Sequence, residues 1–388
     1  MGNRDTRHER LVQGSASSEA VVRVRRDPEA WLRRAWDEEP RVLGAALSLL
    51  SVGYRSALMA RGWVYDARLL STGRLPCPVV SLGNVTVGGS GKTPLAELAA
   101  LTLVALGAAP AVVSRGYGRA TRGVQVVADR GGVRLGARAA GDEPLLLAER
   151  LPGIPVIVGE NRFEAGRHAV EAHGASVIVL DDGYQNRTIA KTLEILVVSA
   201  RAPWGNGRLF PRGQLREPLS TLRRSHVVVV TNPESADEVD AITRMLRLHD
   251  SPAPVVTARY EPLEARRAGG GARLPLSELR GRRLLGFGGL ASPRSFMETL
   301  RGLGVPLAGF AEFGDHHWYT DADLAEVVRR ARIARAEGLI TTEKDAVRLR
   351  ELAPPGLPLW VLTVRMVLAT GQAAWVDALR QVAVPARG

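Results

Sequence analysis

The stretch VVSLGNVTVGGSGKTP, Val79 to Pro94, joins an apolar run to a glycine-rich turn and then to an amphipathic segment. It fits the phosphate-binding pattern G-x-x-x-x-G-K-[ST], except that Thr86 stands where the first glycine belongs. A strand, a glycine-rich loop and a helix start in this order place backbone N–H groups around nucleotide phosphates. Thr86 should avoid positive φ, so the loop must begin differently from the strict form. The residues predicted to bind the nucleotide are Thr86, Gly88, Gly89, Ser90, Gly91, Lys92 and Thr93.

Length and composition indicate a globular protein with two domains. The chain of 388 residues exceeds the roughly 250–300 at which single cores stop growing. Hydrophobic residues make up 45% and charged residues 24%, which excludes a disordered chain. A single cysteine, Cys77, excludes an intramolecular disulfide and suits a reducing compartment. The net charge of +12 favours acidic partners, such as anionic lipid, a phosphorylated substrate or nucleic acid.

Lysine is rare in this chain. Of 52 lysines and arginines, only Lys92, Lys191 and Lys344 are lysines. Arginine replaces lysine easily on a solvated surface, but not where a compact point charge must fit among phosphates. The three lysines are therefore informative positions, and Lys92 lies in the loop quoted above.

Apolar β-branched runs alternate with helix patterns along the chain. IPVIVGE and ASVIVLDD are typical of buried strands, and TPLAELAALTLVALG and NRFEAGRHAVEAHG are typical of helices. The alternation predicts an α/β fold: a P-loop NTPase-type, mainly parallel sheet domain with a second, smaller α/β domain. We expect the P-loop domain over residues 71–200 and the second domain over residues 201–359, with residues 360–388 returning to the first. Residues 201–226 lack a period and predict a functional loop.

The N-terminal part of the chain precedes these domains. Residues 1–40 are polar, with mixed charges, so we expect a flexible or loosely helical extension rather than a secretory signal. In residues 41–70 the uncharged run Val42–Tyr54 has 13 residues, against roughly 20 needed to cross a bilayer as a helix. Two interpretations stay open: a helix in a membrane interface beside anionic headgroups, and a helix packed on the domain core. The residues that favour the interface are Arg41, Arg55, Arg61, Trp63, Tyr65 and Arg68.

Acidic residues and histidines follow the predicted strands and helix starts. Asp181 and Asp182 end the strand Val177–Leu180, where a carboxylate can bind Mg²⁺ directly or through water. The segment AAGDEP places Asp142 and Glu143 at a helix N-terminus, where helix capping and a favourable interaction with the helix dipole are the commoner reason for acids. In FGDHHWYT, His316 lies beside an aspartate and suits proton handling. No cysteine or third histidine at ligand spacing supports a structural metal there.

Several motifs match one family in order: GNVTVGGSGKTP, SRGYGR, GDEP, LDDGYQNR, GNGRLFPRGQLREP, DHHWYT and TTEKDAVRL. Together they resemble tetraacyldisaccharide 4'-kinase, over about Arg41 to Val382. The resemblance implies an ATP- and Mg²⁺-dependent kinase that phosphorylates the 4'-hydroxyl of a tetraacyldisaccharide 1-phosphate in lipid A biosynthesis. It also implies a peripheral or monotopic protein on the cytoplasmic face of the inner membrane. Its partners would be the lipid A precursor and an anionic membrane surface, with no nucleic acid and no obligate protein partner.

The resemblance also implies roles for individual residues. Asp142 corresponds to the general base for the sugar hydroxyl, with His316 as its partner, and Lys92 binds the phosphates. The full catalytic set implied is Lys92, Asp142, Asp181, Asp182, Arg216 and His316. The metal ligands implied are Thr93, Asp181, Asp182 and Glu217.

Two positions depart from the family pattern, and one rival class remains. The family usually has Phe and His where Tyr184 and Asn186 stand, so a titratable group is absent at position 186. The alternative is a membrane-associated deviant-Walker ATPase switch, whose loops carry a lysine where this chain has Val87. A third class, nucleic-acid binding, is suggested by charge alone, because the sequence has no aromatic-basic motif to support it.

Overall fold

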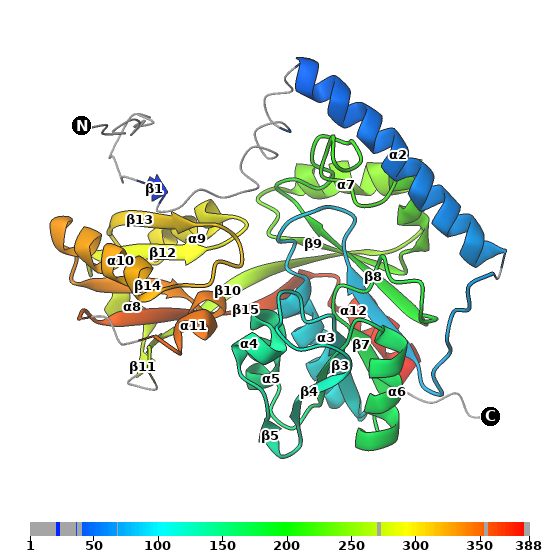
Figure 1. Cartoon of the computed structure of the whole chain (residues 1–388), viewed down its shortest axis with the longest axis horizontal. Coiled ribbons are helices and arrows are strands. Elements are labelled where there is room, and N and C mark those ends of the chain that lie inside the picture. Colours follow the sequence, from blue (N-terminus) through cyan, green and yellow to red (C-terminus); the bar gives the residue numbers. More distant parts are fainter. Residues whose placement is uncertain are drawn as a thin grey trace, which may run out of the picture.

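The computed structural model describes residues 21–23, 36, 41–67, 69–269, 273–352 and 356–383 (Figure 1). Most of the predicted N-terminal extension, and Arg68 in the following segment, lie outside the described residues. Within that extension, β1 pairs in parallel with β13, from Val21 opposite Phe310 to Arg23 opposite Glu312.

The strands form one extended sheet in the order β1-β13-β12-β14-β15-β10-β9-β8-β2-β7-β3-β6-β4-β5, with β11 paired to β10. The strands are β1 (Val21–Arg23), β2 (Val79–Gly83), β3 (Pro110–Ser114), β4 (Gln125–Asp129), β5 (Gly132–Val133), β6 (Val156–Val158), β7 (Val177–Leu180), β8 (Leu193–Ser199), β9 (Val227–Thr231), β10 (Val255–Arg267), β11 (Arg273–Leu274), β12 (Leu284–Gly289), β13 (Leu307–Phe313), β14 (Gly338–Thr342) and β15 (Leu359–Thr370). Most neighbours are parallel, as the apolar β-branched runs predict.

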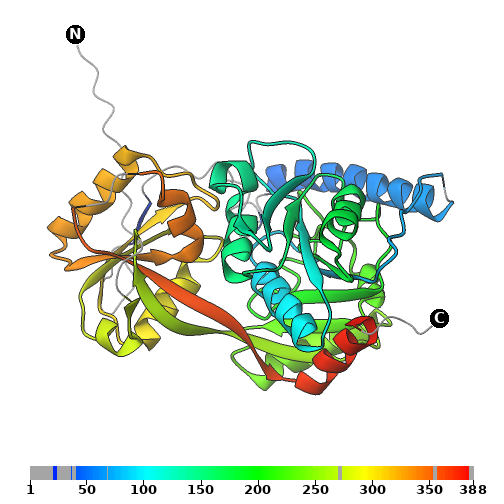
Figure 2. The same cartoon turned by 90° about the horizontal axis from the view of Figure 1, so that it is seen from below.

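Helices cover both faces of this sheet (Figures 1 and 2). They are α2 (Arg41–Asp66), α3 (Lys92–Ala105), α4 (Ala137–Ala140), α5 (Asp142–Arg150), α6 (Arg162–His173), the 3₁₀ helix η1 (Leu219–Arg224), α7 (Ala236–Leu248), α8 (Leu276–Leu279), α9 (Pro293–Gly302), α10 (Asp321–Ile333), α11 (Glu343–Leu349) and α12 (Gln372–Ala383). Local signals fix several ends. The Asn161 side chain accepts from the first N–H groups of α6, and Gly174 ends that helix with a φ of 65°.

The molecule has two lobes joined by a long strand pair. β10 and β15 run antiparallel from Thr257 opposite Thr370 to Arg267 opposite Trp360, and Figure 2 shows this ribbon passing from one lobe into the other. The P-loop lobe carries β2 to β9, and the smaller lobe carries β11 to β14 with α8 to α11. The predicted fold class, a P-loop NTPase-type sheet with a second α/β part, is confirmed.

The change of lobe does not coincide with the sequence-based boundary at residue 200. β9 pairs in parallel with β8, from Val227 opposite Ile195 to Thr231 opposite Ser199, so it extends the P-loop sheet. The aperiodic residues 201–226 therefore form a long loop within one lobe, and the lobes separate along β10. The last helix, α12, packs on α3, where Trp375 is buried and its Nε1 donates to the Thr102 hydroxyl at 3.2 Å.

Helix α2 lies along the outside of the P-loop lobe (Figure 1). One face contacts the loop of residues 201–218: the Ser51 hydroxyl donates to the Leu209 carbonyl, and Tyr54 donates to the Arg216 carbonyl at 2.9 Å. Outside these contacts the helix carries exposed apolar side chains, namely Leu43, Leu49, Leu50, Val52, Met59 and Trp63. By length and composition, Leu43–Tyr65 is the one described segment that could cross a membrane, and only 11% of its most apolar window is buried.

Candidate active site

The glycine-rich loop begins with an extended segment rather than a tight turn. Thr86 forms an isolated antiparallel bridge with Leu215, and the Val87 N–H donates to the Gln214 carbonyl at 2.7 Å. Thr86 is not among the residues with positive φ, as predicted; Gly88 and Gly91 are, at 116° and 86°. The missing glycine is thus explained by pairing with the 201–218 loop, because β-bridge geometry suits a β-branched residue.

Lys92 begins α3 and points toward the end of β7. Its Nζ donates to the Asn84 side-chain oxygen at 3.1 Å and lies 3.6 Å from the Asp182 carboxylate. The side-chain Nε2 of Gln185 in turn donates to the backbone carbonyl of Asn84. The lysine charge is therefore positioned between the glycine-rich loop and the acidic pair, as a phosphate contact requires.

Asp181 is buried beside Thr93 on the first turn of α3. The Thr93 hydroxyl lies 3.4 Å from Asp181 Oδ2 and 3.4 Å from Glu143 Oε2, and Ser114 donates to Asp181 from β3. Burial, together with the charges of Glu143 and Asp182, raises the pKa of Asp181 to about 7. A carboxylate with this much uncompensated negative charge around it is suited to a cation.

Asp182 adopts a left-handed backbone with a φ of 54° and turns away from Asp181. Its oxygens accept from Arg216 Nη1 at 3.1 and 3.3 Å. Burial opposes its charge, but Lys92 and Arg216 outweigh burial and lower the pKa of Asp182. The two adjacent aspartates therefore differ: Asp182 is paired with cations of the protein, and Asp181 is left for another positive charge.

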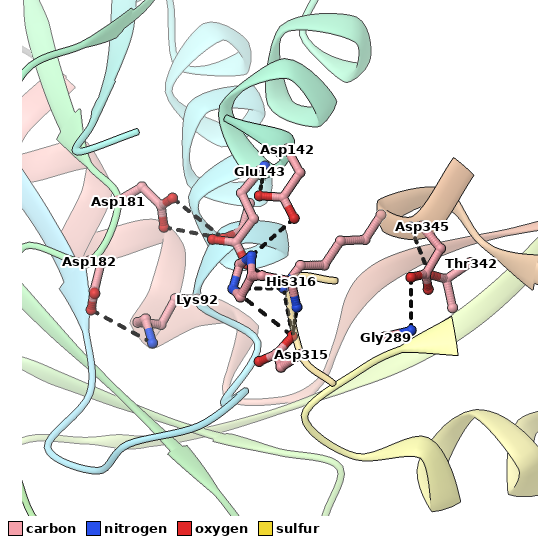
Figure 3. A network of polar contacts seen from close by, with 12 residues as sticks. Lys92, Asp142, Glu143, Asp181, Asp182, Gly289, Asp315, His316, Thr342 and Asp345 are labelled. Atoms are coloured by element: carbon pink, nitrogen blue, oxygen red, sulfur yellow. Dashed lines mark hydrogen bonds and ion pairs between the residues drawn. The ribbon is translucent and has the colours of Figure 1, made fainter. Parts of the chain in front are cut away.

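Asp142 faces His316 across the junction between the lobes (Figure 3). Asp142 lies at the start of α5, and its Oδ2 is 3.0 Å from His316 Nδ1 and 3.4 Å from Arg348 Nε. Burial alone would raise its pKa, but the His316 hydrogen bond, Lys344 and Arg348 bring the pKa down to about 2. His316 itself has a φ of 57°, a strained conformation that is held by contacts on both sides.

Two cations of α11 complete this junction. Lys344 Nζ lies 3.0 Å from Glu143 Oε1 and 3.3 Å from Asp315 Oδ1. Arg348 is fully buried and is fixed by Asp345 at 3.1 Å. The P-loop lobe thus supplies acids at this junction, and the smaller lobe supplies the cations that face them.

The residues present fit a bound nucleotide with its metal. Ser90, in the glycine-rich loop, is buried, and its hydroxyl has no hydrogen-bond partner among the described residues. A buried hydroxyl in this position is suited to a phosphate oxygen. Thr93 and Asp181 offer the oxygen donors that Mg²⁺ prefers. No group of three acidic, histidine or cysteine side chains at metal-binding spacing occurs in the described part of the chain.

The structure brings the predicted catalytic residues together but leaves Glu217, which was predicted as a metal ligand, apart. Its carboxylate is bound to Arg224 at 2.6 Å, in a cluster with Tyr184, Lys191 and Glu194. Burial raises the pKa of Glu217, against the charge of Arg224. Its described partner is thus an arginine, and none of its described contacts is with Asp181 or Asp182, so the metal role predicted for Glu217 has no support in this geometry.

The site contains three residues for which the sequence analysis predicted no role there. Glu143 was considered only as a helix-end acid, and Arg348 lies in a motif without a predicted role. Lys344 had one signal: it is one of three lysines in an arginine-rich chain. Tyr117 adds a fourth contact, with its ring 5.6 Å from that of His316.

The glycine-rich loop, the lysine at a helix start, the acidic strand end and the aspartate–histidine pair define a nucleotide-dependent phosphotransferase of the P-loop class. Comparison with known sequences gives the family. A family model described as tetraacyldisaccharide-1-P 4'-kinase matches residues 43–383, and the chain belongs to that family. The deviant-Walker ATPase alternative is therefore wrong.

Curated relatives and a solved structure agree. A tetraacyldisaccharide 4'-kinase of Syntrophus aciditrophicus is 39% identical over 348 residues, covering 86% of this chain and 93% of the relative. One from Anaeromyxobacter sp. strain Fw109-5 is 44% identical over 321 residues, covering 82% and 86%. The crystal structure of LpxK from Aquifex aeolicus in complex with ATP has a TM-score of 0.70 and 28% identity, covering 88% of this chain and all of that one.

The burial of Asp181 predicts a gain in stability when its charge is removed. Its pKa is raised from 3.8 to about 7 in the fold, so the folded state holds a proton that the unfolded state has lost. This lowers stability increasingly from about pH 4 to about pH 7. Asp181→Asn should raise the melting temperature of the nucleotide-free protein by roughly 2–4 °C at about pH 8, and by less at lower pH. Differential scanning calorimetry from about pH 4 to about pH 8 measures the change in melting temperature. A gain that grows toward acid pH would contradict the raised pKa of Asp181.

Proposed function

We propose that this kinase uses Asp142 as the base and works at a membrane surface. As a member of its family, the chain transfers the γ-phosphoryl group of ATP to the 4'-hydroxyl of a tetraacyldisaccharide 1-phosphate in lipid A biosynthesis. The observation that carries the mechanism is the Asp142–His316 pair, 3.0 Å apart, beside the loop that holds Lys92 and Thr93.

Each residue has a task that follows from its contacts. When bound, ATP would supply the phosphoryl group and Mg²⁺ would neutralise part of its charge. Lys92 would contact the phosphates, while Thr93 and Asp181 would hold the metal. Arg216 pairs with Asp182, and Asp181 faces Thr93 on the other side of the turn. Little covalent chemistry is left to the protein, because phosphoryl transfer depends on positioning and charge stabilisation.

Asp142 accepts the proton of the sugar hydroxyl as the new P–O bond forms and the bond to the ADP oxygen breaks. With a pKa of about 2, its carboxylate is ionised throughout the working range. It is a weak base, so it takes the proton late, when the attacking oxygen has become acidic. His316 fixes the orientation of the carboxylate from the other lobe.

The membrane contact rests on α2. Its apolar face is exposed while its other face is hydrogen-bonded to the 201–218 loop. A helix bound to its own protein along one side is suited to lie in the interface rather than to cross it. Arg55 and Arg61 are exposed beside the apolar face and favour anionic headgroups. We propose that this helix keeps the active site at the cytoplasmic surface of the inner membrane, where the glycolipid resides.

The base assignment predicts a selective loss of turnover. Asp142→Ala should lower kcat by roughly 10²–10⁴-fold, because a positioned proton acceptor contributes about this factor. The KM for ATP should stay close to the wild-type value, since Asp142 has no described contact with the glycine-rich loop. The assay combines labelled ATP with a tetraacylated disaccharide 1-phosphate and follows the product by mass. Equal losses in kcat and in ATP affinity would rule out the base role.

The phosphate role of Lys92 predicts a loss of transfer in a folded protein. Lys92→Ala should lower kcat by roughly 10³-fold or more, because a fixed cation stabilises the charge of the transferred group. An unchanged melting temperature serves as the control for folding. Near-normal transfer to the lipid in this variant would refute the assignment of the loop.

The membrane proposal predicts a position-specific loss of lipid binding. Leu50 is 61% exposed on α2, and Ile333 is 70% exposed at the end of α10 in the other lobe. Leu50→Glu should weaken binding to vesicles containing anionic phospholipid by roughly tenfold or more, and Ile333→Glu should not. Vesicle co-sedimentation at two salt concentrations measures both. Equal binding of the two variants would overturn the role of α2.

A further inference from the structure

Lys344 touches the imidazole of His316 on the side away from Asp142. Its Nζ lies 3.2 Å from His316 Nε2, within hydrogen-bond distance. Burial opposes the charge of Lys344, but Glu143, Asp315 and Asp142 more than offset it, so its pKa is raised above the ordinary value of 10.5. The ammonium group is therefore charged throughout the working range.

A charged lysine can only donate hydrogen bonds, since its nitrogen has no lone pair. His316 Nε2 must then be the acceptor in this contact and carry no proton. The ring proton lies on Nδ1, which donates to Asp142 Oδ2 at 3.0 Å. The two contacts together select one of the two neutral tautomers.

The other groups around the ring agree with this tautomer. Asp315 Oδ1 lies 4.0 Å from Nε2, which is too long for a hydrogen bond. Asp315 instead accepts from Lys344 at 3.3 Å. The groups that face His316 from every side are Asp142 on α5, Tyr117 after β3, Asp315 beside it, and Lys344 on α11, with Arg348 behind Asp142.

We propose that Lys344 is a positioning residue that fixes His316 as the neutral tautomer protonated at Nδ1. In this state the imidazole always donates to the base and never competes with it for the substrate proton. A protonated ring beside Asp142 would weaken the base by adding a full positive charge. A second proton on Nε2 would point at the Lys344 ammonium group, 3.2 Å away.

The same lysine joins the two lobes. Lys344 and His316 belong to the smaller lobe, whereas Glu143, which binds Nζ at 3.0 Å, belongs to α5 of the P-loop lobe. The tautomer is therefore set by a contact that also holds α5 in place, and Asp142 is the neighbouring residue on that helix. Compactness matters here, because an arginine could not place one nitrogen among three partners.

The test reads the ring nitrogens directly. Long-range ¹H–¹⁵N spectra of the full chain, labelled at histidine and held in detergent micelles, distinguish a protonated from an unprotonated ring nitrogen; His316→Gln assigns the signal. We expect Nδ1 protonated and Nε2 unprotonated in the wild type. Lys344→Met should give a mixture of tautomers or a proton on Nε2, with kcat lowered roughly 10- to 100-fold and little change in the KM for ATP.

Controls separate positioning from general damage. Lys344→Arg keeps the positive charge, but a guanidinium cannot place one nitrogen among the three partners of Nζ, so this variant should also lose the single tautomer. Lys191→Met removes another buried lysine, which is paired with Glu194, and should cost stability without moving the His316 signal. A proton on Nε2 in the wild type overturns the proposal even where Lys344→Met does not fold. An unchanged tautomer in a folded Lys344→Met variant overturns it as well.

The inference rests on the proposed base role only for the loss of kcat, and the two can fail separately. Normal turnover in Asp142→Ala would reject the base while leaving the ring nitrogens as the test of Lys344. An altered tautomer in Lys344→Met with unchanged kcat would show that the lysine fixes the ring without serving catalysis, which also overturns its positioning role.

Discussion

The contact between acids of α5 and cations of α11 is the interaction on which the active site depends. Asp142 and Glu143 come from the P-loop lobe, and Lys344 and Arg348 come from the smaller lobe. Burying one of these charges alone would cost several kcal/mol, on the order of the desolvation of an ion in a protein interior. The acids of α5 and the cations of α11 therefore stabilise one another. The contacts that hold Asp142 in place are also contacts between the two lobes. The long β10–β15 ribbon then needs only to connect the lobes.

A second chain of contacts links the membrane-facing helix to the nucleotide site. Tyr54 on α2 donates to the carbonyl of Arg216, whose side chain holds Asp182 beside Lys92. The same loop pairs with Thr86 through Leu215. The loop of residues 201–218 thus lies between α2 and the phosphate-binding loop and is bonded to both. A shift of α2 would therefore reach Asp182 through the Tyr54 hydroxyl and the Arg216 side chain.

The sequence predicted the parts of this protein that local rules determine. The glycine-rich loop, the strand end at Asp181 and the start of α5 follow from periodicity and motif, and Thr86 was rightly expected to avoid positive φ. The sequence placed a domain boundary at residue 200, where the structure has none. The change in texture there marks an active-site loop, and the strand after this loop, β9, pairs with β8 in the same sheet. The metal role of Glu217 was implied by the family resemblance, and in the structure the Glu217 carboxylate pairs with Arg224.

Lysine rarity was the one compositional signal that reached beyond motifs. All three lysines are in tight polar clusters: Lys92 with Asn84 and Asp182, Lys191 with Glu194, and Lys344 at the junction of the lobes. Each has partners within a few ångströms on several sides, where a compact ammonium group fits and a planar guanidinium does not. In an arginine-rich chain, the few lysines therefore mark positions where arginine does not fit the local geometry.

Asn186 shows the opposite case, in which a titratable residue was replaced without loss of local structure. Its side-chain oxygen accepts from the Thr188 N–H at 3.0 Å and from the Thr188 hydroxyl at 2.9 Å, which closes the turn after the acidic pair. The residue after Asn186 is a cation, Arg187. It donates to the Gly62 carbonyl and lies 5.4 Å from the centroid of the Tyr65 ring. A guanidinium keeps its charge at all working pH, whereas a histidine would not. The end of α2 is therefore joined to the active-site loop through the contacts of Arg187 with Gly62 and Tyr65.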